Sequence, residues 1–447
     1  MGLAWKTLKS GSKIPFMKRN QVANSGGELA VPTHFRCPIS LDLMRDPVTA
    51  PTGITYDRQS IESWFERGNR TCPVTGQGMK VEELIPNHSI RRMIQEWCVA
   101  NRGSGVERVP TPRIPMAATE VVEILQQIET ASRRGDGARC GKLAAKLKDS
   151  AKESERNRRC ISSNGASRAL SASFGELSSK TGDLEEVLSA LVTFLPLDEE
   201  SHKHIQSPAS LKSIVSIIRS GSFQGRFNST LVLKDLVSSL DSDGIEAVAK
   251  TDGLAEVLVQ HLQKPISPQL TKTSLVTIFY LVSPNTRAAS RFVELGLISL
   301  LLDILVDSER SMSEKALGVL DGLFNSERGR QSGGDHALTV PLLVKKMFRV
   351  SDMATEFAVS ALWKLCKNDD GKESEGEEGI EEERAEEGCL VEALQVGAFQ
   401  KLLLLLQVGC NGPTKERASD LLKLLNGSRG GVECIETVDF KGLKRPF

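Results

Sequence analysis

The sequence predicts a mainly helical protein in which a small N-terminal α+β unit precedes a long array of helical repeats. Aromatic residues make up only 5% of the 447 residues, so the core must come mainly from Leu, Ile, Val and Ala, which favours helices. Beyond Ala117 these residues recur at spacings of three and four, the period of an α-helix. The length also exceeds that of one compact domain.

Residues 1–30 are expected to form a flexible basic arm. The arm contains no acid before Glu28, and its basic residues are Lys6, Lys9, Lys13, Lys18 and Arg19. These residues interrupt any signal peptide, and no later apolar run reaches the ~18–20 residues that span a membrane. We therefore expect no transmembrane segment and a cytoplasmic protein, with the nucleus and the membrane surface left open by the arm.

Charge and cysteine content disfavour two broad classes of protein. The chain has 57 Lys and Arg residues and 57 Asp and Glu residues, so it lacks the positive excess of a nucleic-acid coat, and we expect no nucleic-acid partner. Its nine cysteines are scattered and form no C-x-x-C pair, which disfavours a secreted disulfide framework. The sequence indicates a reducing compartment.

The compact N-terminal unit begins with a loop and a hairpin. The loop runs from Pro38 to Leu43, a turn follows at Asp46-Pro47, and a short hairpin is expected around Thr52-Gly53. The next segment predicts a central helix, capped by Asp57 or Ser60, with an apolar side formed by Ile61, Trp64 and Phe65.

A second loop and a second helix complete this unit. The loop holds Cys72, Pro73 and Val74, and Asn87 precedes a helix with one apolar face, which comprises Ile90, Met93, Ile94 and Trp97. Residues 104–116, with three prolines in six residues, predict an extended linker to the array.

Residues 117–430 contain a repeat. Small residues followed by dense apolar helices give anchors at positions 166, 209, 254, 297, 337 and 398, with intervals of 43, 45, 43, 40 and 61 residues. A period of 40–47 residues with two or three helices is typical of armadillo and related repeats. We expect a superhelix whose concave surface binds an extended protein segment, and a tail over residues 431–447.

The longest interval contains an acidic insertion. Residues 369–388 hold eleven acids against Lys372 and Arg384, and without these twenty residues the interval of 61 becomes 41. Such charge density cannot bury apolar surface, so we predict a disordered loop within an otherwise regular array.

A zinc site is not expected in the N-terminal unit. A cross-braced two-zinc domain needs eight ligands in close pairs, whereas this window offers only His34, Cys37, Cys72, His88 and Cys98. The unit must instead be held by its apolar core and by polar side chains between the loops, such as Arg36, Asp46, Arg58 and Glu62. Their pairing cannot be assigned from the sequence.

An ordered series of motifs resembles the U-box family, the zinc-free relative of RING ubiquitin ligases. The motifs are Pro38-Ile39, Asp46-Pro47, the segment from Gly53 to Arg58, Cys72-Pro73 and Ile85-Pro86-Asn87. We therefore identify residues 31–103 as a U-box. With the armadillo-like array, the whole chain resembles the plant U-box/armadillo-repeat ubiquitin ligases.

That resemblance implies a RING-type ubiquitin ligase without a covalent step or cofactor of its own. The U-box would recruit a conjugating enzyme charged with ubiquitin and promote transfer to lysines of a substrate held by the repeats. Family contacts carried onto this chain are Ile39, Leu41, Trp64 and Pro73. An exposed apolar patch of this kind suits a transient interface.

The chain departs from the family pattern at one place, and two alternative functions stay open. Where many relatives have an Arg that clamps the charged ubiquitin, this chain has Gly76 and Gln77, so Gln77 is the candidate replacement. A weak clamp would suit an adaptor or scaffold without transfer activity. An enzyme with Cys37 or Cys72 as nucleophile is the third hypothesis, and it needs a His base nearby.

The resemblance also implies properties beyond the ligase reaction. U-box units often pair, so a homodimer through the U-box is one expectation. Roles in plant stress or defence signalling are another. The sequence does not identify the substrate, the conjugating enzyme or the type of ubiquitin chain.

Overall fold

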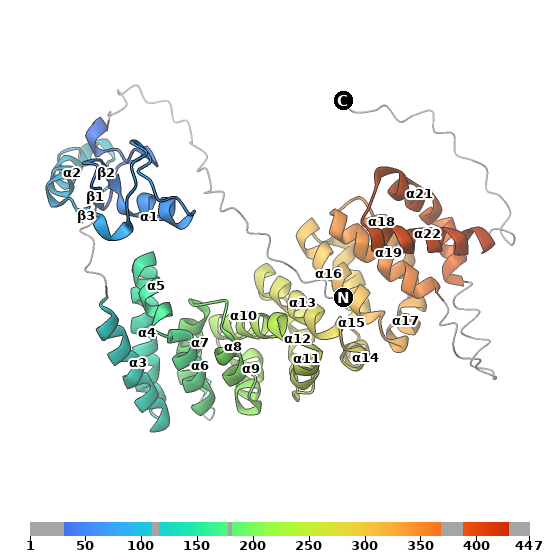
Figure 1. The fold of residues 1–447 in the computed structure, drawn as a ribbon. Coiled ribbons are helices and arrows are strands. Elements are labelled where there is room, and N and C mark those ends of the chain that lie inside the picture. The colour runs from blue at the N-terminus through green and yellow to red at the C-terminus, as the bar shows by residue number, and fades with distance from the viewer. Residues whose placement is uncertain (1–30, 110–115, 178–180, 368–387, 429–447) are drawn as a thin grey trace. The chain divides into compact units, whose positions relative to one another are not determined.

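The computed structural model describes residues 31–109, 116–177, 181–367 and 388–428 (Figure 1). The chain divides into two compact units, Met1–Pro115 and Met116–Phe447. The predicted basic arm, the acidic insertion up to residue 387 and the C-terminal tail lie outside the described residues.

The N-terminal unit contains a three-stranded antiparallel sheet with the strand order β2-β1-β3. The predicted hairpin pairs β1 (Pro47–Thr49) with β2 (Thr55–Asp57), and Val48 lies opposite Tyr56. Gly53 supplies the positive φ of 80° that the turn between them requires. The third strand, β3 (Ile85–Pro86), pairs with the free edge of β1 and was not predicted.

Two α-helices flank this sheet. The central helix α1 covers Arg58–Glu66, and α2 covers His88–Ala100. Three short 3-10 helices accompany them, η1 (Thr33–Phe35), η2 (Val81–Glu83) and η3 (Arg102–Ser104). Ile61 of α1 and Ile94 of α2 are fully buried, as their apolar spacing predicts, whereas Met93, predicted on the same apolar face as Ile94, is 48% exposed.

The folded N-terminal unit continues past the start of the expected linker. Val109 is buried in the core of this unit, and Val106 packs against that core. The Gln95 side-chain amide of α2 donates a hydrogen bond to the Val109 carbonyl oxygen over 3.3 Å. Residues 105–109, here called the strap, therefore belong to the N-terminal unit.

The second unit is built from repeats of three helices, preceded by α3 (Ala118–Arg133) and α4 (Gly137–Glu153). First helices of the repeats are α5 (Glu155–Ser163), α8 (Glu199–Ile205), α11 (Ser242–Ala249), α14 (Thr286–Glu294) and α17 (Glu327–Gly334). Second helices are α6 (Ala166–Glu176), α9 (Pro208–Ser220), α12 (Leu254–Gln263), α15 (Leu297–Asp307), α18 (Thr339–Lys346) and α21 (Ala398–Val408). Third helices are α7 (Thr181–Val192), α10 (Phe223–Ser239), α13 (Pro268–Val282), α16 (Arg310–Leu323), α19 (Asp352–Cys366) and α22 (Gly412–Gly427).

The sequence anchors coincide with the starts of the second helices. Gly165, Gly253, Gly296 and Gly397 have φ between 75° and 82°, and each directly precedes a second helix. This left-handed conformation turns the chain sharply from the first helix into the second, and glycine adopts it at little cost. The other two anchors differ, since Ser207 caps α9 with its hydroxyl and α18 begins two residues after Ala337.

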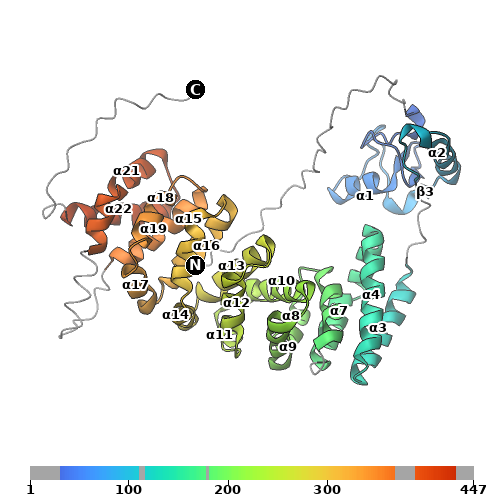
Figure 2. The same cartoon turned by 180° about the vertical axis from the view of Figure 1, so that it is seen from behind.

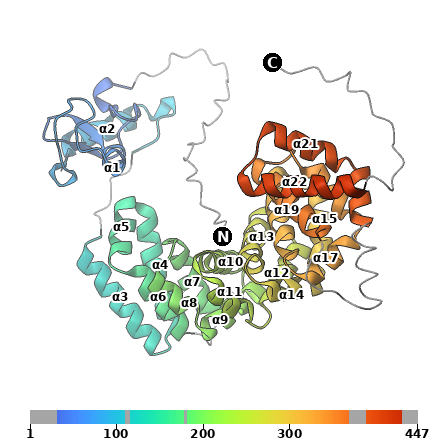
Figure 3. The same ribbon diagram turned by 45° about the vertical axis from the view of Figure 1, so that its right-hand side comes forward.

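The third helices form a continuous row through the array. Each packs against the next, from α4 and α7 through α10, α13, α16 and α19 to α22. Figures 2 and 3 show the repeats following one another in sequence order along this row. Contacts between neighbouring repeats therefore build one extended core, as a repeat array requires.

Two further findings concern the described residues of the whole chain. All their cysteines are free thiols. No single helix among them has the length and apolar character to cross a membrane, although Gly388–Gln395 and Ala398–Val408, bent by 70°, pass that test as a pair on length and composition alone.

Candidate functional site

The two loops of the N-terminal unit close in the same way. In the first loop the Cys37 amide donates to the Asp42 carbonyl oxygen over 2.9 Å, and the Leu41 amide donates back to the Cys37 carbonyl oxygen over 2.8 Å. In the second loop Cys72 makes the equivalent bonds, with Gln77 over 2.7 Å and with Gly76 over 2.9 Å. The segments Cys37–Asp42 and Cys72–Gln77 are therefore two copies of one turn.

Both loop cysteines point inward and hold the loops to the hairpin. The Cys37 sulfur accepts a hydrogen bond from the Asp57 amide over 3.3 Å, and the Cys72 sulfur lies 2.9 Å from the Tyr56 hydroxyl. The two residues are 0% and 2% exposed. Because neither thiol faces solvent, this geometry disfavours the nucleophile hypothesis.

The hydrogen bonds at Cys72 change its acidity. Burial on its own raises the pKa of the Cys72 thiol, but hydrogen bonds with Thr52, Thr75 and Tyr56 outweigh burial and lower this pKa to about 6. Burial is also the main reason that the pKa of Tyr56 is raised. The tyrosine therefore stays protonated beside the sulfur.

Leu41 holds an unusual position at the tip of the first loop. Its φ is +62°, in the left-handed region that a leucine rarely adopts, and its side chain is 69% exposed. The equivalent residue in the second loop is Gly76, with φ +71°. The first loop therefore has a strained, exposed leucine at the position where the second loop has a glycine, which adopts this conformation without strain.

Ile39 of the first loop and Trp64 of α1 are less exposed than Leu41. Both are half-buried and pack against the core of the unit. The Trp64 indole N–H donates to the Thr71 carbonyl oxygen over 2.8 Å, which fixes the ring and joins α1 to the second loop. Pro73 is half-buried in that loop, directly after the buried Cys72.

Polar side chains connect the remaining elements. Asp46 forms ion pairs with Arg58 of α1, over 2.7 Å, and with Arg91 of α2. Asp57 occupies the N-cap position of α1 as expected, but its side chain does not cap the helix. Its carboxylate instead accepts hydrogen bonds from the amides of Arg45 and Asp46, over 2.8 and 2.9 Å. Of the polar side chains expected to hold the unit together, Asp46 and Arg58 are therefore paired with each other.

An open groove of about 960 Å³ lies beside the first loop. Ile39 and Leu43 from the loop and Trp64 from α1 supply its apolar lining, and residues Val106–Val109 of the strap also line it. We call this feature the first-loop groove. The contribution of the strap was missed because two valines among polar and glycine residues give no helical or strand period.

The other predicted site residues have simpler positions. Gln77 is exposed, and its backbone carbonyl takes part in closing the second loop. Among the described residues, no group of three or more His, Cys, Asp or Glu side chains is placed to hold a metal ion. The predicted absence of zinc stays a prediction.

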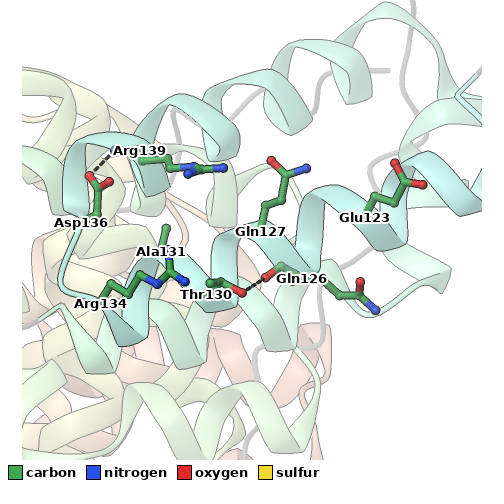
Figure 4. Close-up of a pocket in the computed structure, with 8 residues that line it drawn as sticks. All are labelled: Glu123, Gln126, Gln127, Thr130, Ala131, Arg134, Asp136 and Arg139. Carbon is green, nitrogen blue, oxygen red and sulfur yellow. Dashed lines mark hydrogen bonds between the residues drawn. The ribbon is translucent and has the colours of Figure 1, made fainter.

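A second hollow lies between α3 and α4, with a volume of about 370 Å³ (Figure 4). Its lining is mostly polar and comes from Gln126, Thr130, Arg134, Asp136 and their neighbours. Asp136 caps α4 by accepting a hydrogen bond from the Arg139 amide over 3.0 Å. The other hydrogen bond in this lining, from the Thr130 hydroxyl to the Gln126 carbonyl oxygen over 2.8 Å, lies within α3, so both bonds serve the helices.

Comparison with known families identifies the class of both units. Residues 31–103 match the U-box domain, and residues 120–444 match the plant U-box protein ARM repeat region. The chain therefore belongs to the plant U-box proteins with armadillo repeats, which confirms the predicted fold class and the family resemblance.

Named relatives give the family-level activity. U-box domain-containing protein 21 of Arabidopsis thaliana is 38% identical over 100% of both chains. The E3 ubiquitin-protein ligase PUB23 of the same plant is 34% identical over 90% of this chain and 95% of its own. At the level of the family, the chain is thus a ubiquitin transferase of the U-box type.

Solved structures resemble the chain in fold. One, entitled "A conserved phosphorylation switch controls the interaction between cadherin and beta-catenin in vitro and in vivo", has a TM-score of 0.50 at 16% identity and covers 76% of this chain and 66% of its own. The designed armadillo repeat protein YIII(Dq)4CqI has a TM-score of 0.46 at 17% identity, over 58% of this chain and 99% of its own.

Proposed function

We propose that this protein is an E3 ubiquitin ligase whose first-loop groove binds a conjugating enzyme charged with ubiquitin. The observation that carries the proposal is Leu41, which is strained and exposed at the tip of the first loop, between Ser40 and Asp42, two residues that line the groove. A leucine at φ +62° costs roughly 1–2 kcal/mol compared with glycine. Such a cost is expected where a side chain is held outward for a partner.

We propose that the groove acts by positioning the ubiquitin thioester, without a chemical step of its own. The two loop cysteines are buried, so the ubiquitin thioester stays on the conjugating enzyme and the substrate lysine attacks it there. The ligase would hold this thioester in a reactive orientation, which raises the rate without a covalent intermediate of its own. Pro73 and the exposed amide of Gln77, on the second loop, are proposed to contact the conjugating enzyme and its ubiquitin.

The repeat array is proposed to hold the substrate. Its row of third helices, from α7 to α22, gives one extended surface that suits a long protein segment.

A U-box homodimer is a further part of the proposal. It is supported by two exposed apolar side chains outside the groove, Ile85 and Val99. Light scattering of the full chain would then give twice the mass of one chain.

The proposal predicts that Leu41→Gly separates binding from stability. Glycine relieves the strain at φ +62°, so the thermal midpoint of the full chain should stay the same or rise. Affinity for the conjugating enzyme should fall by about fivefold or more, as for loss of a central apolar contact, and chain formation should fall with it. Titration calorimetry measures the affinity for the conjugating enzyme, and a ubiquitination assay with activating enzyme, ubiquitin and ATP measures chain formation.

Two further variants complete this experiment. Ile39→Ala should also abolish chain formation, although a half-buried isoleucine contributes to stability as well. Val408→Ala removes a side chain that is 70% exposed in the array, so it controls for the loss of any exposed apolar group and should leave chain formation unchanged. Full activity in Leu41→Gly and Ile39→Ala would contradict the proposal.

An adaptor without transfer activity is the second candidate, because Gly76 and Gln77 stand where many relatives carry an Arg. The same assay distinguishes the two. Binding of conjugating enzymes that depends on Leu41, together with no ubiquitin chains from any of them, would favour the adaptor.

A further inference from the structure

The strap is fixed to the N-terminal unit by several contacts. Gly105, at φ +84°, ends η3 and turns the chain back toward the core. Val106 packs against this core, Val109 is only 6% exposed, and the Val109 carbonyl oxygen accepts the hydrogen bond from Gln95. The valines anchor the two ends of a short segment whose middle is Glu107 and Arg108.

The strap lies along the groove assigned above to the conjugating enzyme. Glu107 and Arg108 line the first-loop groove together with Ile39 and Trp64. The strap does not fill the groove, since an open volume of about 960 Å³ remains beside it. A protein seated on Ile39 and Trp64 would therefore also meet the strap.

The two charged residues of the strap are available to a partner. Both are exposed, and within the described part of the chain neither makes an ion pair. Asp46 and Arg58 of the same unit differ, because they satisfy each other over 2.7 Å. Exposed charges at the rim of an interface contribute little affinity but discriminate strongly between partners.

We propose that the strap forms one wall of the binding site for the conjugating enzyme, and that Glu107 and Arg108 determine which conjugating enzymes the ligase prefers. This inference rests on the proposed function of the first-loop groove. It assigns a specificity role to residues that lie beyond the matched U-box region, residues 31–103. Partners with a basic rim would favour Glu107, and partners with an acidic rim would favour Arg108.

The test compares charge reversals on the strap with matched reversals elsewhere on the unit. Glu107→Lys and Arg108→Glu are made in the full chain, with Glu96→Lys and Arg92→Glu as controls. The control residues are exposed on α2 and do not line the groove; they form an ion pair with each other over 3.0 Å, so the double variant Arg92→Glu/Glu96→Lys, which keeps the pair, is measured as well. Dissociation constants for a panel of conjugating enzymes are measured at low and at high salt, with the thermal midpoint of every variant.

The proposal expects opposite effects from the two strap variants. For a given conjugating enzyme, one variant should strengthen binding and the other weaken it by about threefold, because they add opposite charges to the same groove. The direction should differ between enzymes, and the effect should shrink at high salt. The α2 controls should leave the dissociation constants unchanged.

The outcomes that overturn the proposal are distinct from failure of the proposed function. If Leu41→Gly and Ile39→Ala weaken binding while the strap variants change no dissociation constant, or change all of them equally, the strap has no specificity role and the groove assignment stands. If Leu41→Gly and Ile39→Ala leave binding intact, both proposals fail. Equal effects of strap and α2 variants would show a general response to net charge.

Discussion

Single residues decide what each of the two loops presents to a partner. Leu41 and Gly76 occupy the same place in two copies of one turn, yet only the first loop keeps a side chain there. The family resemblance predicted Leu41 as a contact. The positive φ was not predicted, because leucine by itself predicts a negative value, and the turn became apparent only from the paired backbone hydrogen bonds.

Cys72 gives a prediction at the same scale. Its pKa of about 6 in the folded chain lies below its ordinary value of 9.0, so the folded state binds fewer protons between these pH values. The stabilisation is therefore complete above about pH 9 and is lost as the pH falls through about 6. Hydrogen exchange of residues 31–109 should show stability that rises from pH 6 to pH 9 in the native chain and less so in Cys72→Ser. Identical pH profiles would contradict this.

At the scale of helices and strands, most of the fold could be predicted from the sequence. Apolar spacing predicted α1 and α2, and the small-residue anchors predicted the repeats, because both signals are local. The features that the sequence did not predict have a common physical cause. Strand β3, the role of the Asp57 carboxylate and the strap all depend on contacts between segments distant in sequence, which local pattern does not encode.

The glycines before the second helices give a prediction about these elements. Gly296 has φ +75°, and a Cβ added there would have no heavy atom within 4 Å, so Gly296→Ala tests backbone strain alone. The variant should lose about 1–2 kcal/mol of unfolding free energy, and Gly296→Asn less, because asparagine tolerates this conformation. Chemical denaturation measures both losses.

A matched control is present in α17. Gly334 is the last residue of this helix, without positive φ and with equally open surroundings. Gly334→Ala should therefore be neutral, or stabilising by less than the roughly 1 kcal/mol that separates alanine from glycine in a helix interior. Equal losses at the two glycines would show that the array responds to any added methyl group.

At the scale of the whole molecule, the chain joins two compact units, for which we propose separate tasks. The period of 40–45 residues predicted the array, and the motif series predicted the U-box, so this division could be read from the sequence. The array begins with contacts of its own, since the Met116 amide donates to Asn157 over 3.0 Å. Its first residue is thus held within the second unit.

Deletion of residues 1–115 should leave a folded array. Because the two units form separate compact bodies, the thermal midpoint of the array should change by no more than about 2 °C. The shortened protein should form no ubiquitin chains, because it lacks the U-box. Circular dichroism and the ubiquitination assay check the two halves of this prediction. A much lower midpoint would show that the units stabilise each other.

The row of third helices has an evolutionary consequence. Because each third helix packs on the one before it, a whole repeat of about 43 residues is a unit that duplication or deletion can add or remove while the neighbouring faces stay compatible. The acidic insertion follows α19 in the sequence, and α19 still packs on α22. A lineage can thus change the length of the repeat array in discrete steps without altering the U-box.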